Sequence, residues 1–267
     1  MLGSRGLRRL VLLALGLGAC LPARVVRTPQ AEFRHLYSLG RYGRVTIQNL
    51  YGDVTITVWD RDDVLVEAVK RASDRQRLAD ARVVVEPSAG TLSIRTLYAG
   101  TGPAAATEGA RPATVEYRIT VPRSASLEQV RLVNGGLVID GVSGPVKASA
   151  VNGGIRAIRL GGEADLSTVN GPLEAGFQRL SRTQPISLTS VNGPIRLSIP
   201  CGAGASLSAH NRSGGIDSEF GSVARERDGN SLRAQVNHGG APIRLDNVNG
   251  GIAIHSEWSR RREKSAL

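Results

Sequence analysis

Apolar and polar residues alternate through most of this chain, in short runs that are separated by glycine-containing turns. Clear examples are residues 54–59, 64–69 and 115–121. Alternation with a period of two is typical of strands that bury one face. One segment departs from it: residues 73–81 predict a short helix with Ser73 as its N-cap. The pattern therefore predicts an all-β protein.

A Gly-containing turn signal recurs through the second half of the chain. Asn and Gly both tolerate the positive φ that tight turns need. The first three signals are 18 residues apart, and the next three spacings grow to between 21 and 25 residues, with insertions expected at 200–204 and 224–230. Asn side chains stacked along such a corner could hydrogen-bond to one another. The predicted structural turn residues, each followed by Gly-Gly or Gly-Pro, are Asn134, Asn152, Asn170, Asn192, Ser213, His238 and Asn249.

Apolar residues stand at the third and fifth positions after the turn residue, as in Leu137 and Ile139 or Ile155 and Ala157. In a strand these two positions share one face. Each unit then consists of two short strands and two turns, and it cannot bury its apolar face without neighbours. The period predicts a right-handed β-solenoid, a β-helix-like stack of short strands with Asn-Gly-Gly turns, in which residues such as Leu137, Ile155 and Leu173 form internal columns.

The amino terminus has the pattern of an export signal. Arg5, Arg8 and Arg9 precede an apolar run at 10–17 that is shorter than the roughly 20 residues needed to cross a bilayer. Leu17-Gly18-Ala19-Cys20 resembles the lipobox of bacterial lipoproteins, in which the cysteine is acylated. The alternative is ordinary signal cleavage, for example after Gly16, which leaves Cys20 in the mature chain. The expected organisation is a signal peptide at 1–19, a linker at 20–32, an N-terminal β region at 33–125, a repeat β-solenoid at 126–258 and a basic tail at 259–267.

The charge of the chain limits the classes of partner it can bind, and its cysteine content limits disulfide formation. The net charge is +11, of which the signal supplies three arginines, so the mature chain carries 11 − 3 = +8. An exported basic protein can bind anionic glycans or lipopolysaccharide phosphates, or it can have a solvated basic surface without a ligand. Export argues against nucleic acid as a partner. The two cysteines, Cys20 and Cys201, permit a disulfide only if Cys20 is not acylated.

Catalytic patterns are scarce in the repeats. A carbohydrate-active β-helix enzyme, such as a pectate lyase or polygalacturonase, needs clustered carboxylates or a base beside bound calcium. Asp140 is level with Ile158 and Gly176 of the next units, and Asp165 is level with Lys147 of the unit before it. The four histidines are dispersed and lack zinc-site spacing. We therefore expect no enzyme activity, no cofactor, no metal and no catalytic residue.

Three features together resemble one family: the segment Asn49-Leu-Tyr-Gly-Asp-Val-Thr-Ile-Thr-Val58, the strand at 115–122, and the serial Asn-Gly-Gly turns. They are similar to DUF4097, a family of putative adhesin domains of bacteria. The resemblance covers most of residues 33–256 and implies an exported β-solenoid, often lipid-anchored, without established catalytic residues. Relatives often have Ser-Gly-Asp at the turns, so the acidic residues of the corner are missing here and a cation-binding role is not expected.

The leading hypothesis is a non-catalytic exported cell-envelope protein, an adhesin-like surface-interaction or scaffold lipoprotein. Its expected partners are the membrane, through a lipid anchor at Cys20 on the outer membrane, and an anionic glycan, lipopolysaccharide or an envelope protein. Two alternatives stay open at this point: a polysaccharide lyase or hydrolase, and a structural envelope-stress lipoprotein without a ligand.

Overall fold

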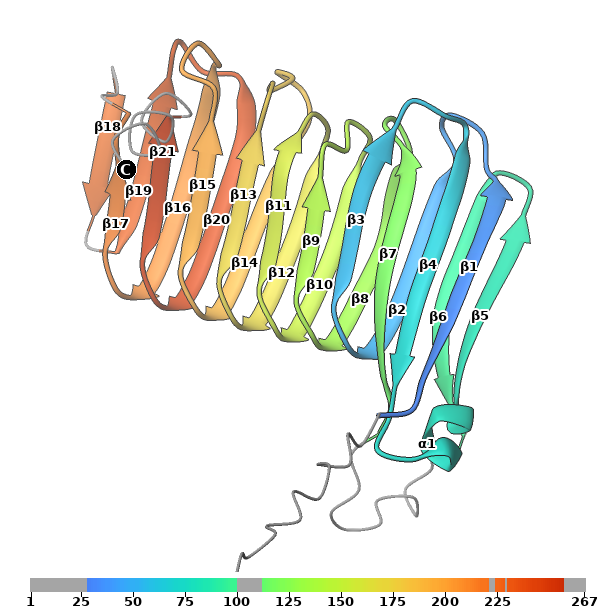
Figure 1. Ribbon diagram of the computed structural model, residues 1–267. Helices are drawn as coiled ribbons and strands as arrows, with labels where there is room; N and C mark the ends of the chain where they lie inside the picture. The colour runs from blue at the N-terminus through green and yellow to red at the C-terminus, as the bar shows by residue number, and fades with distance from the viewer. Residues whose placement is uncertain (1–27, 100–111, 221–223, 229, 257–267) are drawn as a thin grey trace, which may run out of the picture.

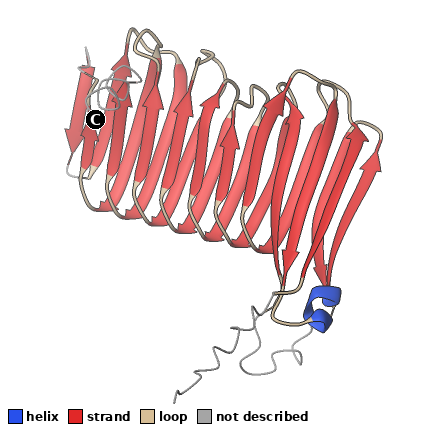
Figure 2. Cartoon of the chain, viewed as in Figure 1, coloured by secondary structure: helices blue, strands red, loops and turns tan. Residues whose placement is uncertain are grey.

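The computed structural model describes residues 28–99, 112–220, 224–228 and 230–256. These residues are nearly all β: they form 21 strands and one short helix, as Figure 2 shows. The predicted signal peptide, most of the predicted linker and the basic tail lie outside the described residues. Among the described residues, no helix has the length and apolar character needed to cross a membrane.

The strands form two long sheets that lie face to face (Figure 1). In spatial order, sheet A contains β1 (Gln30–Ser38), β4 (Asp63–Arg71), β7 (Thr114–Pro122), β3 (Val54–Trp59), β9 (Leu137–Asp140), β11 (Ile155–Leu160), β13 (Leu173–Phe177), β15 (Ile195–Ile199), β21 (Ile252–Ser256) and β17 (Ile216–Ser218). Sheet B contains β18 (Ala224–Asp228), β19 (Ser231–Val236), β16 (Ala205–Ser213), β20 (Ala241–Asn249), β14 (Ile186–Asn192), β12 (Ala164–Asn170), β10 (Val146–Asn152), β8 (Ser126–Asn134), β2 (Arg44–Tyr51), β6 (Thr91–Tyr98) and β5 (Ala81–Ser88).

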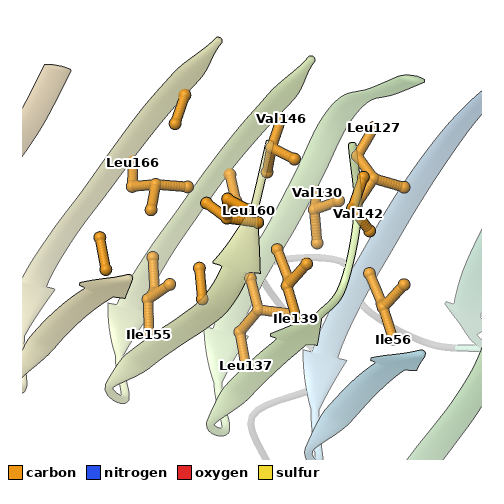
Figure 3. Close-up of a cluster of buried hydrophobic side chains, with 14 of the residues drawn as sticks. Ile56, Leu127, Val130, Leu137, Ile139, Val142, Val146, Ile155, Leu160 and Leu166 are labelled. Atoms are coloured by element: carbon orange, nitrogen blue, oxygen red, sulfur yellow. The ribbon is translucent and has the colours of Figure 1, made fainter. Parts of the chain in front are cut away.

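The centre of the molecule is a stack of rungs, each with one strand in either sheet. In the four rungs from β8–β9 to β14–β15, the chain passes regularly from one sheet to the other, and each strand pairs in parallel with its equivalent in the next rung. Ile155 is level with Leu137 on one side and Leu173 on the other, which confirms the predicted column. All three side chains are fully buried between the sheets, and the close-up in Figure 3 shows two of them, Leu137 and Ile155, in this interior. Burying one such side chain contributes about 1.5–3 kcal/mol to the stability of the folded state.

The rungs at both ends are not stacked in chain order. The final rung, β20–β21, lies between β14–β15 and β16–β17, although β16 and β17 precede it in the chain. In the same way, β2–β3 lies between β8–β9 and the strands β6 and β7. Beyond these rungs the pairing becomes antiparallel, through β4 and β1 at one end and through β19 and β18 at the other. The stack therefore has interleaved ends.

Three local expectations need correction or refinement. The helix α1 (Arg75–Asp80) has Asp74 as its N-cap and not Ser73, since the Asp74 carboxylate accepts a hydrogen bond of 2.9 Å from the backbone N of Arg77. Residues 224–228, within the expected insertion at 224–230, form a strand, β18, which pairs with β19 at the end of sheet B. The strand β1 begins at Gln30, inside the predicted linker.

A buried polar chain ties the interleaved rung β2–β3 to its neighbours. The hydroxyl of Thr96 donates to Oδ1 of Asn49 at 3.0 Å, so the hydroxyl of Tyr117, 2.7 Å away, donates to Thr96. The Asn49 amide in turn donates to the carbonyl oxygens of Val115 at 2.8 Å and Gly52 at 2.9 Å. Desolvation by burial raises the pKa of Tyr117 to about 12. The chain connects β7, β6 and β2 inside the core.

This burial predicts a loss of stability at alkaline pH. The unfolded chain releases the Tyr117 proton near pH 10, below the folded pKa, so the folded state binds more protons and stability falls as pH rises from about 10 to about 12. The loss from this group should be up to about 3 kcal/mol. Urea unfolding between pH 8 and 12 should show a shallower pH dependence for Tyr117→Phe than for the control Tyr42→Phe, whose ring is 78% exposed. Equal slopes in the two variants would contradict the assignment.

Glycine at the corner turns is required by close backbone approach. A Cβ on Gly153 would lie 2.0 Å from the carbonyl oxygen of Gly135 in the previous rung, whereas a Cβ on Gly215 would meet nothing within 4 Å. Gly153→Ala should therefore lower the free energy of unfolding by about 3 kcal/mol, because the backbones must move apart. Gly215→Ala should change it by less than about 1 kcal/mol. Urea titration of the two variants provides the measurement, and similar losses would show that rung spacing is not the limiting factor.

Candidate functional site

Six of the seven predicted turn residues lie along one edge of the stack, which we call the corner. The registers align Asn134, Asn152, Asn170, Asn192, Asn249 and Ser213 on successive strands of sheet B. The seventh, His238, has a positive φ of 66° but lies in the turn between β19 and β20, away from the corner. Its His-Gly-Gly sequence matches the turn signal, but the residue is not aligned with the corner asparagines.

The corner asparagines form a continuous hydrogen-bonded ladder. Each Nδ2 donates to Oδ1 of the next residue: Asn249 to Asn192 at 2.9 Å, Asn192 to Asn170 at 3.0 Å, and Asn170 to Asn152 and Asn152 to Asn134 at 2.9 Å each. Asn134 ends the ladder by donating to the carbonyl oxygen of Leu50 at 3.3 Å. The ladder is a structural feature of the turns, since its amides bond to one another.

The opposite edge consists of turns that vary in length and carry arginine. Backbone hydrogen bonds join neighbouring turns along this edge. For example, the N–H of Ser143 donates to the carbonyl of Arg123, and the N–H of Gly161 donates to the carbonyl of Val142. We call this line the arginine edge. Its cationic residues are Arg41, Arg61, Arg123, Arg159, Arg179 and Arg182.

At the N-terminal end of the arginine edge, three turns enclose a cleft of about 310 Å³. Trp59 forms one wall, and its indole N–H donates to the carbonyl oxygen of Asp63 at 2.8 Å, which fixes the ring. The guanidinium carbon of Arg61 lies 5.1 Å from the centroid of that ring. The residues around the cleft are Arg41, Trp59, Asp60, Arg61, Asp62, Pro122, Arg123 and Ser124.

The charges of the cleft are held in loose, exposed pairs. The Nε of Arg41 is 3.6 Å from Asp62, and the Nε of Arg123 is 3.4 Å from Asp60. Asp62 is 61% exposed and Asp60 is 86% exposed, so water screens both pairs and each contributes little to stability. Three guanidiniums against two carboxylates leave one positive charge in excess. Planar guanidiniums match carboxylate or phosphate oxygens in geometry, and Trp59 adds an aromatic surface.

The remaining candidate residues do not gather into a site. As the spacing predicted, Asp140 is level with Ile158, and Asp165 is level with Lys147. The structure adds an ion pair of 3.1 Å between Lys147 and Asp165. No group of three metal-ligating side chains occurs among the described residues. Cys201 is an exposed free thiol, and Cys20 lies outside the described residues. Sequence reasoning missed the cleft, because its three turns are far apart in the chain.

Searches by sequence find no matching family model and no matching curated protein. Solved structures do match. A putative cell adhesion protein from Clostridium sporogenes has a TM-score of 0.51 at 11% identity, with 86% of this chain and 100% of that chain covered. Putative adhesins from Bacteroides fragilis and Parabacteroides merdae have TM-scores of 0.35 and 0.34, at 11% and 10% identity, with 85% and 84% of this chain and 97% and 95% of theirs covered. The Clostridium protein shows a shared fold.

Removing one asparagine from the ladder should have a measurable cost. Asn170 accepts from Asn192 and donates to Asn152. Asn170→Ala removes both bonds and should lower the free energy of unfolding by about 1–2 kcal/mol. In the control Ser213→Ala, at the end of the row, the loss should stay within about 0.5 kcal/mol. Urea denaturation distinguishes the two cases, and an unchanged midpoint for Asn170→Ala would mean that water replaces the ladder bonds at no cost.

Proposed function

We propose that this chain is a non-catalytic, adhesin-like protein of the bacterial cell envelope that binds an anionic glycan through its arginine edge. In this proposal the chain belongs to the DUF4097 family, the stack is a right-handed β-solenoid, and export and acylation at Cys20 attach it to the outer membrane. The cleft around Trp59 is the main support for a binding role. It combines an excess of positive charge, three guanidiniums against two carboxylates, with an aromatic wall.

The chemistry of the cleft favours a sugar that carries carboxylate or phosphate groups. An aromatic ring can pack against the apolar face of a pyranose, while guanidiniums bind its acidic oxygens in a planar, bidentate way. The existing ion pairs of Arg41 and Arg123 are long and screened, so an acidic ligand can displace them at small cost. The line of further arginines along the same edge offers additional contacts to an extended polymer.

The carboxylates support binding over hydrolysis. A glycoside hydrolase places its two carboxyl groups in different environments, so that one donates a proton while the other is ionised. Asp60 and Asp62 instead share one environment: both are exposed, and both face a guanidinium. This similarity favours an electrostatic role for the pair.

The test is binding of the chain from residue 21 onward to immobilised polygalacturonate, as a model acidic polysaccharide, across a range of salt concentrations. The triple variant Arg41→Ala, Arg61→Ala, Arg123→Ala should lose about tenfold or more in affinity at low salt. The matched control is Arg196→Ala, Arg212→Ala, Arg233→Ala, which removes the same charge from the exposed sheet faces.

Equal losses in the two triple variants would show attraction by net charge alone and would reject the cleft. Absence of retention of the unmodified chain at low salt would favour the structural lipoprotein without a ligand. Shortening of the polymer during the assay would favour the polysaccharide-processing enzyme.

A further inference from the structure

The corner has no ionisable side chain in its turns over five neighbouring rungs. The sequences at this edge are Leu-Val-Asn-Gly-Gly-Leu, Ala-Val-Asn-Gly-Gly-Ile, Thr-Val-Asn-Gly-Pro-Leu, Ser-Val-Asn-Gly-Pro-Ile and Asn-Val-Asn-Gly-Gly-Ile, at 132–137, 150–155, 168–173, 190–195 and 247–252. In a chain of which 21% is charged, these five turns carry no charge, and the first charged residues beyond them are Asp53 at one end and Arg212 at the other. A neutral edge can approach an apolar phase without dehydrating a charge.

A row of apolar side chains runs beside the asparagine ladder on the outer face of sheet B. Four of its members are exposed: Leu97 by 45%, Val151 by 40%, Val169 by 38% and Leu50 by 37%. The whole row has one residue on each of seven adjacent strands, so at about 4.8 Å between neighbouring strands it is roughly 29 Å long. We call it the valine stripe, and it consists of Leu97, Leu50, Val133, Val151, Val169, Val191 and Val248.

The described chain begins at the same edge. Gln30 pairs with Arg71, and Arg71 pairs with Thr114. The next residue, Val115, lies at the corner, where its carbonyl oxygen accepts a hydrogen bond from Asn49. Figure 1 shows the start of β1 beside α1 at the foot of the molecule, on the side of the corner turns. A tether attached before Gln30 therefore leaves from the corner edge.

The tether is short compared with the molecule. Ten residues, 20–29, separate Cys20 from the first residue of β1. Fully extended, they reach about 34 Å. An acyl chain on Cys20 would hold the N-terminal end of the corner within that distance of the membrane, which is about the length of the valine stripe.

We propose that the valine stripe lies against the lipid headgroup layer of the membrane that holds the Cys20 acyl chains, so that the arginine edge faces away from it. This inference rests on the lipid anchor of the proposed function. Several polar groups of the corner are paired within it: the asparagine amides bond along the ladder, and the backbone N of Gly153 donates to the Asn170 carbonyl at 2.9 Å. A partly exposed stripe is a weak membrane ligand alone, and it becomes effective as a second contact beside an acyl anchor.

The test uses the full chain, produced with its signal sequence in a Gram-negative bacterium, labelled with radioactive palmitate and reconstituted in phosphatidylcholine vesicles. A polarity-sensitive fluorophore is attached at Val151→Cys on the stripe, or at Ser181→Cys, an exposed position on the arginine edge, each with Cys201→Ser. Brominated phosphatidylcholine should quench the label at position 151 and shift its emission to the blue. It should leave the label at 181 unchanged.

Val169→Cys provides a second stripe position should Val151→Cys not fold. Two outcomes would overturn the proposed orientation if palmitate is incorporated: equal quenching at the stripe and at position 181, or no quenching at either stripe position. Both would leave the lipid anchor supported. A blue shift at position 151 without bromolipid quenching would mean that a second protein copy covers the stripe, and it would also overturn the inference. A chain without palmitate would remove the anchor itself, independently of the fluorescence.

Discussion

Burial of the inner face of each rung by a neighbouring rung is the constraint on which the structure depends. A rung alone exposes Leu137 or Ile155 to water and leaves backbone groups such as the N–H of Gly153 without a partner; the next rung satisfies both needs at once. The terminal rungs have no such neighbour on one side. The antiparallel strands β1, β4, β18 and β19 supply it there. The interleaving also places the last rung of the chain, β20–β21, between two others, so the carboxyl-terminal rung does not form an end of the stack.

The same constraint separates the two edges of the stack. At the corner, backbones approach so closely that a Cβ on Gly153 has no space, and the sequence is limited to Asn, Gly and Pro with apolar neighbours. At the opposite edge backbones approach closely at single glycines, since a Cβ on Gly144 would lie 2.3 Å from the carbonyl oxygen of Ala125, but the turns around these points vary in length and residues. The cleft around Trp59 lies among these variable turns, and variable loops held by a rigid scaffold are where binding residues often occur in proteins.

Much of the stack could be predicted from the sequence because its cause is local and periodic. The column through Leu137, Ile155 and Leu173 follows from a fixed offset after each turn. The order of the terminal rungs could not be predicted, because no local sequence feature indicates that β14 pairs with β20 instead of β16. The sequence predicts His238 as a corner residue because His-Gly-Gly matches the turn signal, but the fold places it in the turn between β19 and β20. The cleft depends on Arg41, Trp59 and Arg123, which only the fold brings together.

Five residues of the valine stripe recur in the sequence as Val-Asn-Gly. Strand alternation assigns the residue before each asparagine to the outer face of the sheet, where a polar side chain is usual. Parallel stacking explains part of this choice, because identical β-branched side chains pack well at strand spacing. It does not explain why five successive corner turns contain no charge in a chain whose net charge is +11. The proposed contact with the lipid headgroup layer would account for both features with one cause, and the arginine edge would then face away from the membrane.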